Sequence, residues 1–390
     1  MARADVDEAH RVTRMKQRLV FITNIAAPYQ VKFCYALQEH FDTEFWFYEQ
    51  LTERRPDWWK VPLGDRCRVL TDSRFIGSLN YVSFDVFRQL NRFKPDIILL
   101  AGFTPLHSLI LRFAKRKGSK VVVLSEPIRD VNGEDNASDK LLERVNAKWK
   151  TRLLHHMFAG ADLIFGMGQV ARDQFVREFA FADSQVVNAP YPIDIETYFS
   201  HPLRIKRAGD PIRILFANRL IDRYQPLVAL EAYRRLKRDY PNLSLALNRD
   251  GHLYEACRDY IAAHELKDIS FLEDIDAWDN MHLVYRNADI LVLPATYSNG
   301  NITIIEACAS GMGTVVSRRV DNVSRHLKEG ENCFKCDPTA TSLEAALRNY
   351  LDAPELLEIH GALSKQHVEH RRNDNTALTY RNLIVQAHHI

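Results

Sequence analysis

The sequence predicts an α/β protein made of two doubly wound, Rossmann-like domains in tandem. Short apolar segments recur along both halves of the chain and alternate with stretches of helical periodicity. Several of them, such as 96–101 (DIILLA) and 120–125 (KVVVLS), are apolar without interruption, which indicates burial on both faces, as in a parallel sheet. The length of 390 residues also exceeds what one hydrophobic core usually organises.

The first half supplies the expected elements of an N-terminal domain at 17–190. A helix near 29–40 follows the first strand, and a crossover helix ends at Gly118. Residues 1–16 are charged and contain no apolar segment like that of a secretory signal, so we expect a disordered or extended N-terminus. The strands of this half are predicted at 19–24, 44–48, 96–101, 120–125 and 163–167.

A polar loop and a basic helix interrupt this alternation. The loop begins at residue 129, and helical periodicity follows at 141–161, with a basic face of Arg144, Lys148, Lys150 and Arg152. Two interpretations stay open: the basic face is the solvated side of a packed helix, or it contacts an acceptor or a membrane surface.

The second half repeats the alternation after a proline-rich linker at 191–211. A C-terminal domain is expected at 212–369, with a clear helix between Pro226 and Pro241. Its strands are predicted at 212–217, 243–247, 269–272, 290–293 and 314–317, and its last helices at 341–353 and 355–386. Two parallel-sheet units in tandem follow from this order.

The most informative segment lies at 287–318. A buried strand leads into the polar loop 298–301 (SNGN), which opens a short helix carrying Glu306. Loop N–H groups and a helix N-terminus bind anions, and a carboxylate one turn further on can accept bonds from ribose hydroxyls. This pattern indicates a nucleotide diphosphate-sugar site, although an ordinary packing unit has the same outline.

This segment resembles the donor-site motif of retaining family-4 (group 1) glycosyltransferases, which have the GT-B fold. The family motif runs Glu-Gly-Phe-Gly, four mostly apolar residues, Glu-Ala, small residues, Gly and Pro-Val-Val. The chain has SNGNITIIEACASGMGTVV. Glu306 falls on the second glutamate of the E-x7-E pair and Gly311 on the closing glycine. Ser298 replaces the first glutamate, which contacts the transferred sugar in the family, so the motif is degenerate.

The resemblance extends to residues that bind the donor in the family. Asn218-Arg219-Leu220 is similar to a Gly-Arg-Leu segment whose arginine binds the diphosphate, a task suited to the guanidinium fork. Tyr224, flanked by Arg223, stands where the family has a lysine. The residues expected to bind the donor are Asn218, Arg219, Arg223, Tyr224, Arg249, Ser298, Asn299, Gly300, Asn301, Ile302, Thr303 and Glu306.

The acceptor is expected on the first domain, at the carboxyl edge of its sheet. Asn24, Ala27 and Gln30 follow the first strand, where small residues let a ligand approach the backbone. Glu126 ends the 120–125 strand in a segment that resembles the Trp-Ser-Glu of one subgroup. It either accepts a proton from the acceptor or caps the following loop. The candidate catalytic residues are Glu126, Arg219 and Asn301.

Composition excludes other classes of protein. The net charge of +2 lacks the basic footprint of a nucleic-acid binder. The six cysteines include one C-x2-C pair, Cys333 and Cys336, without the second pair that a zinc site needs. We therefore predict no metal site, and reduced thiols in a cytoplasmic protein.

The resemblance implies a retaining, metal-independent, hexosyltransferase-like enzyme. Its donor would be a UDP- or GDP-type sugar, with no other cofactor. Its acceptor would be a glycan or a lipid-linked molecule at the cytoplasmic membrane face, in surface polysaccharide biosynthesis. The final helix, at about 370–390, would pack back on the first domain. The alternative is a non-catalytic GT-B subunit that binds a sugar nucleotide or a partner.

Overall fold

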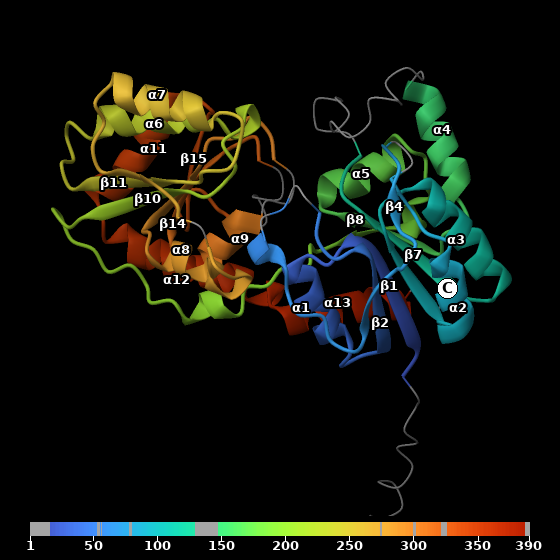
Figure 1. Cartoon of the computed structure of the whole chain (residues 1–390). Helices are drawn as coiled ribbons and strands as arrows, with labels where there is room; N and C mark the ends of the chain where they lie inside the picture. Colours follow the sequence, from blue (N-terminus) through green and yellow to red (C-terminus); the bar gives the residue numbers. More distant parts are fainter. Residues whose placement is uncertain are drawn as a thin grey trace, which may run out of the picture.

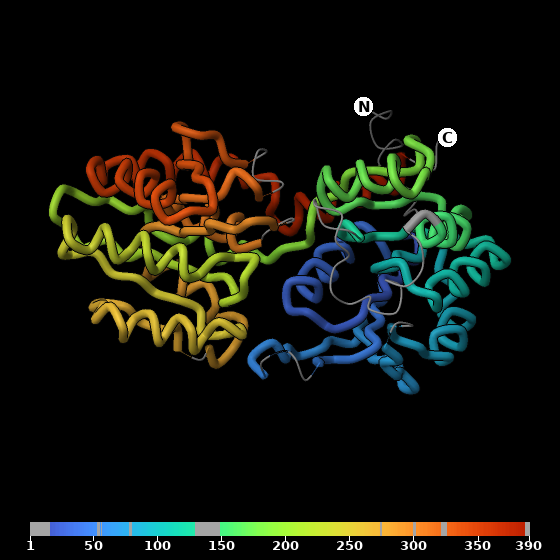
Figure 2. The backbone as a smooth tube through the Cα atoms, turned by 90° about the horizontal axis from the view of Figure 1, so that it is seen from above, coloured from blue at the N-terminus to red at the C-terminus, as the bar shows by residue number. Residues whose placement is uncertain are grey.

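The computed structural model describes residues 16–52, 55, 57–77, 80–128, 147–273, 275–298, 302–320 and 326–386. Two α/β domains lie side by side, each built around one parallel sheet (Figures 1 and 2). This arrangement confirms the predicted fold class.

The first sheet has the strand order β3-β2-β1-β6-β7-β8-β9, and all its pairs are parallel. The order reverses direction between β1 and β6, so the loops after these two strands diverge and leave space between them. The strands are β1 (Arg18–Ile25), β2 (Asp42–Glu49), β3 (Cys67–Val69), β6 (Ile97–Ala101), β7 (Lys120–Ser125), β8 (Leu163–Met167) and β9 (Val186–Ala189). A small antiparallel pair, β4 (Arg74–Phe75) and β5 (Tyr81–Val82), stands apart from this sheet.

Helices cover both faces of the first sheet. α2, α3, α4 and α5 contribute side chains to one core cluster, whereas α1 packs on the opposite face. α3 illustrates why the helices begin where they do, since Pro105 is its first residue and the Thr104 hydroxyl accepts the His107 N–H at 3.1 Å. The helices are α1 (Pro28–Leu37), α2 (Asp85–Phe93), α3 (Pro105–Arg116), α4 (Ala147–Phe158) and α5 (Gln169–Arg177).

The second sheet repeats this topology with the order β12-β11-β10-β13-β14-β15. Its strands are β10 (Ile212–Phe216), β11 (Leu243–Leu247), β12 (Ile269–Phe271), β13 (Ile290–Leu293), β14 (Gly313–Ser317) and β15 (Phe334–Cys336). Its helices are α6 (Pro226–Leu236), α7 (Tyr254–Ala263), α8 (Met281–Arg286), α9 (Ile302–Ala309), α11 (Ala340–Asp352) and α12 (Leu356–Val368). The switch point lies between β10 and β13.

Five of the described strands were not predicted from the sequence, and two of these, β4 and β5, form the separate antiparallel pair. The other three, β3, β9 and β15, have only three or four residues and lie at the edges of the two sheets. The remaining edge strand, β12, was predicted. Edge strands are buried less completely, so their apolar signal is weak. Of the predicted helix at 141–161, the structure describes α4, and its first part lies outside the described residues.

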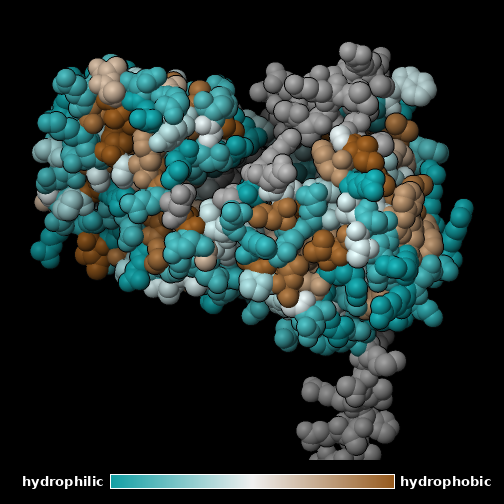
Figure 3. Space-filling view, viewed as in Figure 1, coloured by the Kyte–Doolittle hydropathy of each residue, from teal (hydrophilic) through white to brown (hydrophobic). Residues whose placement is uncertain are grey.

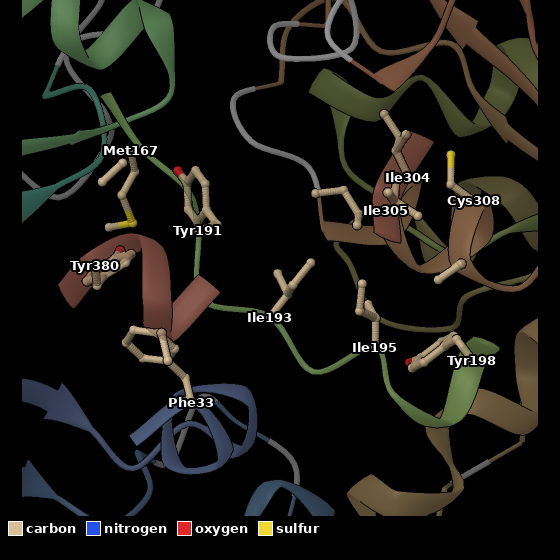
Figure 4. Packing of buried hydrophobic residues seen from close by; sticks show 14 of the residues in the cluster. Phe33, Met167, Tyr191, Ile193, Ile195, Tyr198, Ile304, Ile305, Cys308 and Tyr380 are labelled. Carbon is tan, nitrogen blue, oxygen red and sulfur yellow. The ribbon is translucent and has the colours of Figure 1, made fainter. Parts of the chain in front are cut away.

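The first part of the linker is packed between the domains, whereas residues 207–211 are exposed. Ile193, Ile195 and Tyr198 are buried in an apolar core shared by both domains (Figure 4). The last helix, α13 (Asn373–Gln386), crosses back to the first domain. Its Tyr380 ring packs against Phe33 of α1 at 4.8 Å between ring centroids. The two domains are therefore joined by apolar contacts as well as by the chain itself.

Candidate functional site

A cavity of about 350 Å³ opens at the carboxyl edge of the first sheet. Asn24, Ala27, Gln30 and Glu126, the residues predicted to bind the acceptor, all line it. The cavity lies beside the switch point between β1 and β6, where open parallel sheets usually bind ligands. The structure thus brings these residues together, and their contact with an acceptor stays a prediction.

The loop after β1 holds two amide side chains at this cavity. Asn24 Oδ1 accepts the Ile25 N–H at 2.9 Å and the Thr23 hydroxyl at 3.2 Å. The same hydroxyl lies 3.5 Å from Gln30 Oε1. These contacts engage the amide oxygens, so the amino groups are the atoms that can donate to hydroxyls of a ligand.

Glu126 follows β7 and borders the same cavity. Desolvation by the surrounding protein raises the pKa of its carboxyl group. A hydrogen bond donated by Tyr191 and the positive charge of Arg223 oppose this shift. Arg223 belongs to the second domain, so a charge of that domain acts on the carboxyl group of the first. A carboxylate with a raised pKa accepts a proton more readily, as a general base must.

His107 lines the cavity but is fully engaged by its neighbours. Nδ1 lies 2.8 Å from the Gly102 carbonyl oxygen, and Nε2 lies 3.0 Å from the Tyr48 hydroxyl. Burial lowers its pKa to about 4, although the Gly102 contact opposes that shift. The ring is therefore neutral at pH 7, and its bonds hold the wall of the cavity.

In the second domain, Gly251 locks two loops of the carboxyl edge together. It has φ +138°, and a Cβ at this position would lie 2.2 Å from the Leu220 carbonyl oxygen. Leu220 N–H in turn donates to the Asp250 carbonyl oxygen at 2.6 Å. Only glycine permits this approach, so the loops after β10 and β11 lie in direct contact.

This contact places Arg219 beside Asp250. Arg219 Nε lies 2.6 Å from Asp250 Oδ2, and both side chains are more than half exposed, at 56% and 64%. Exposed ion pairs are weakly held. The guanidinium is therefore free to exchange the carboxylate for a phosphate, as predicted for the donor site.

Other predicted donor residues surround the start of α9. The Thr303 hydroxyl donates to Asn218 Oδ1 at 3.1 Å, which ties the end of β10 to the first turn of α9, where Ile302 is the first residue. The Arg223 guanidinium stacks on the Tyr224 ring at 4.8 Å from its centroid. These groups meet at one edge of the sheet.

Besides Glu306, five predicted donor residues remain, and the structure describes two of them. Arg249 is exposed on the loop after β11. Ser298 is buried and forms an isolated β-bridge with Val320, outside the strands of the sheet. The rest of the predicted loop, Asn299, Gly300 and Asn301, lies outside the described residues. The anion site formed by the N–H groups of this loop and the catalytic role of Asn301 therefore stay predictions.

Glu306 has partners that the sequence did not reveal. The carboxylate is 4% exposed, and it accepts hydrogen bonds from the hydroxyls of Tyr198, at 3.2 Å, and Tyr285. Burial raises the pKa of Glu306 to about 7, while the two tyrosine bonds oppose this shift. The structure thus shows tyrosine hydroxyls where ribose hydroxyls were expected, and the ribose contact stays a prediction.

Aromatic side chains join the two domains near the cavity. Trp278 of the second domain contacts Tyr29 and Trp59, with ring centroids 6.2 and 5.5 Å away. Tyr29 and Trp59 also line the cavity. Lys32 adds ion pairs at 2.8 Å to the linker's Asp194 and at 2.7 Å to Asp279.

Two aromatic residues near the site, Trp278 and Tyr191, were not predicted from the sequence. Tyr191 lies in the proline-rich linker, and Trp278 lies in a polar segment without periodicity. A tryptophan among polar residues was the one signal that could have drawn attention to this segment, because large aromatic side chains concentrate at contact surfaces.

Comparison with known proteins agrees with this geometry. Residues 202–366 match the family model of glycosyl transferases group 1. No curated protein matches the chain in sequence. The match covers the end of the linker and most of the second domain.

Solved structures match nearly the whole chain. A glycosyltransferase from Rickettsia africae ESF-5 superposes with a TM-score of 0.68 at 13% identity, covering 95% of this chain and 98% of that one. The sucrose-phosphate synthase of Thermosynechococcus elongatus gives 0.69 at 15% identity, with 95% and 99% covered. Alr3699/HepE of Anabaena, in complex with UDP and glucose, gives 0.65 at 13% identity, with 95% and 98% covered. At such identities the likeness shows the fold, and it confirms the predicted GT-B architecture.

The structure also bears on the metal and membrane expectations. Among the described residues, no three His, Cys, Asp or Glu side chains gather as metal ligands would. Cys333 and Cys336 are buried free thiols whose pKa burial raises to about 12. Of the helices in the described ranges, none combines the length and apolar character that a bilayer crossing demands.

Proposed function

We propose that this protein is a retaining glycosyltransferase that moves a sugar from a nucleotide diphosphate-sugar to a hydroxyl of a glycan or lipid-linked acceptor. The observation that carries the proposal is the cavity at the carboxyl edge of the first sheet, which Asn24, Gln30 and Glu126 line. Glu126, at the edge of the first sheet, lies within the electrostatic influence of Arg223, at the edge of the second. A carboxyl group beside an amide-lined cavity can bind an acceptor hydroxyl and take its proton, and the arginines of the second domain can bind a diphosphate.

The donor would bind to the second domain. Arg219 and Arg223 would hold the diphosphate, and Asn218 with Thr303 would fix the start of α9 against it. The cations also stabilise negative charge on the leaving diphosphate, which supports a reaction without a metal ion. The complex of Alr3699/HepE with UDP and glucose supports a UDP-type donor, with GDP as the second choice.

The transfer forms a bond between the acceptor oxygen and the anomeric carbon of the donor sugar. The bond from that carbon to the diphosphate oxygen breaks, and its electron pair leaves with the diphosphate. The acceptor proton passes to Glu126 or to the leaving phosphate. Attack from the face that the diphosphate leaves would retain the anomeric configuration. A cytoplasmic location and a role in surface polysaccharide synthesis complete the proposal, and both rest on the family resemblance.

A second candidate, a non-catalytic subunit that binds sugar nucleotides, is favoured by two observations. Ser298 stands in place of a glutamate, and tyrosines occupy the Glu306 carboxylate. A subunit of this kind would bind the nucleotide and release no product.

Two measurements distinguish these candidates. Thermal unfolding with UDP, GDP, ADP and CMP, each with and without its sugar, identifies the nucleotide that stabilises the protein. Release of the free nucleoside diphosphate from the stabilising donor, with glycan and lipid-linked acceptors, then tests transfer. Stabilisation without release in any acceptor mixture identifies the subunit. Failure of every nucleotide to stabilise the protein contradicts both candidates.

A further inference from the structure

A second cavity, of about 260 Å³, lies where the two domains meet the C-terminal segment that returns to the first domain. Figure 3 shows that the surface is hollowed between the two domains. The volume falls just below the roughly 300–1,000 Å³ usual for drug-sized ligands, so the cavity suits a small ligand. Its wall takes residues from every part of the chain that meets there, namely Gly168 of the first domain, Tyr191 of the linker, His326 of the second domain, and His370, Arg371 and Thr379 of the returning segment.

Arg371 brings a buried positive charge to this wall. It is 7% exposed and ends η8 (Glu369–Arg371), the short turn between α12 and α13. Its Nη2 donates to the Tyr191 carbonyl oxygen at 2.9 Å, and its Nη1 lies 3.2 Å from His326 Nε2. Both of these partners are neutral atoms, so the two bonds fix the guanidinium between the domains without cancelling its charge.

Two imidazole rings lie beside the guanidinium. The ring centroids of His326 and His370 are 5.3 Å apart. Because an arginine only donates, His326 Nε2 accepts the bond from Arg371, and the ring proton is on Nδ1. Burial lowers the pKa of His370 and the charge of Arg371 lowers it further, while a backbone contact with His367 opposes the shift. Both rings are therefore neutral at pH 7, and each carries one N–H donor.

The described part of the wall contains no acidic side chain. Glu369, the acid of η8, pairs with Arg372 at 3.1 Å, and Glu196 of the linker pairs with the same arginine at 2.6 Å. These carboxylates therefore serve the neighbour of Arg371. A guanidinium with further N–H donors around it is the arrangement that binds phosphate-type oxyanions, because its fixed fork matches two oxygens at once.

We propose that this cavity, which we call the anion cavity, binds a phosphate group. The guanidinium of Arg371 supplies the charge, and the imidazoles of His326 and His370 supply N–H donors beside it. The site is separate from the predicted donor site, where Arg219 and Arg223 lie in the loop after β10. Because its wall includes residues of both domains, a bound phosphate also holds the domains together.

The anion cavity adjoins the cavity that contains Glu126. Met167 lines that first cavity, and the next residue, Gly168, lines the second. Tyr191 connects the two, since its hydroxyl donates to Glu126 and its carbonyl oxygen accepts from Arg371. A phosphate bound to Arg371 therefore steadies the residue that holds the carboxyl group.

Two sources of the phosphate have the same chemistry. One is a phosphate carried by the acceptor, whose hydroxyl then lies at Glu126, and this source rests on the proposed function. The other is free inorganic phosphate, which would bind whether or not the protein transfers a sugar. Phosphate binding without sugar transfer would thus support this inference and count against the proposed function alone.

Thermal unfolding of the full chain, titrated with inorganic phosphate at an ionic strength kept constant with chloride, tests the proposal. We expect phosphate to stabilise the wild-type protein in a saturable manner. Thr379→Glu adds a carboxylate to the wall of the cavity and should weaken phosphate binding at least about tenfold, because like charges repel. Arg371→Gln should weaken it to a similar extent, and Thr379→Glu remains decisive if loss of the buried arginine prevents folding.

Two variants of α13 outside the cavity are the matched controls. Gln386→Glu adds the same charge as Thr379→Glu, and Arg381→Gln removes the same charge as Arg371→Gln, both at exposed positions. Each should bind phosphate within about twofold of wild type, because exposed charges are screened. The titration is repeated in Arg219→Ala, which removes the predicted phosphate contact of the donor site, and the stabilisation should survive there.

Glucose 1-phosphate distinguishes the two sources. A phosphate carried by the acceptor predicts that glucose 1-phosphate binds more tightly than inorganic phosphate, and that Gln30→Ala, a change in the first cavity, removes the difference. Free phosphate as the ligand predicts equal affinities in both proteins. Either result, combined with loss of binding in Thr379→Glu, supports the anion cavity.

Three results would overturn the proposal. The first is a wild-type protein that phosphate stabilises no more than chloride does. The second is equal weakening in the cavity variants and the α13 controls. The third is stabilisation that disappears in Arg219→Ala and persists in Thr379→Glu, because the phosphate would then bind at the donor site.

Discussion

The two domains share one topology but present different chemistry at the same edge. Both sheets reverse their strand order next to the first strand of the domain, and both place their candidate residues in the loops after those strands. The first domain offers amides, hydroxyls and Glu126 around a cavity. The second offers Arg219 and Arg223 in the loop after β10. Strand order therefore determines where a ligand binds, and the loops determine which ligand binds there.

The largest expected effect comes from removing the acid of the first domain. Glu126→Gln keeps the shape of the side chain and the bond to Tyr191 but cannot accept a proton. We expect kcat to fall by about 100-fold or more, with donor affinity unchanged. Steady-state kinetics and calorimetric titration of the donor measure the two quantities. Glu126→Asp should recover part of the activity. A variant that keeps full kcat would assign Glu126 to loop capping.

The next largest expected effect is on the pH dependence of the unfolding free energy, which replacement of Glu306 should change. Its pKa of about 7 in the folded protein exceeds its ordinary value of 4.5, so the proton is bound more tightly in the folded state. The resulting stabilisation is complete below about pH 4.5 and is lost as the pH rises through 7, a change of about 3 kcal/mol. Glu306→Gln removes this dependence, so the variant should become the more stable protein above pH 7.

Chemical denaturation of both proteins across this pH range measures the difference. Because other buried groups such as His107 titrate in both proteins, their effect cancels in the comparison. A stability difference that does not change with pH would show that the carboxyl group is not shifted. A large loss of nucleotide affinity in Glu306→Gln would instead support the predicted ribose contact.

Replacement of Arg219 tests the donor site of the second domain, as replacement of Glu126 tests the acceptor site of the first. Arg219→Ala should weaken nucleoside diphosphate binding by about 2 kcal/mol, roughly 30-fold, because a charged bond to the diphosphate is lost. Calorimetric titration measures this, with Arg238→Ala as the control for loss of an exposed arginine. Equal affinity in wild type and Arg219→Ala would remove this residue from the donor site.

The smallest expected effect concerns the contact between the domains. Lys32 joins buried Asp194 to Asp279, which is 78% exposed. Lys32→Met should lower the free energy of unfolding by about 1 kcal/mol, because it leaves a buried carboxylate with fewer partners. Asp279→Asn should change it by less than about 0.5 kcal/mol, because exposed pairs contribute little. A larger loss of unfolding free energy for Asp279→Asn than for Lys32→Met, measured by denaturant unfolding, would contradict this account of the interdomain contact.

Much of the fold could be predicted because its central strands are apolar without interruption. The strands 243–247 and 290–293 match β11 and β13 residue for residue. Most candidate residues were predicted from the resemblance to the family's motifs, and those of one domain lie together because parallel strands end at a common edge. Contacts between distant segments could not be predicted in this way. Tyr198 lies 108 residues from Glu306, and no local pattern marks the two as partners.

The interdomain contacts escaped prediction for the same reason. Trp278 meets Tyr29 and Trp59 only because the linker and α13 hold the domains together. Periodicity reports which side of an element is buried, and it carries no information on which other element covers that side.

A crystal structure with bound UDP tests the central claim most directly. The account predicts the diphosphate within hydrogen-bonding distance of Arg219 and next to the start of α9, with the cavity lined by Asn24, Gln30 and Glu126 left open for the acceptor. A nucleotide bound in that first-domain cavity, with Arg219 still paired to Asp250, would contradict it.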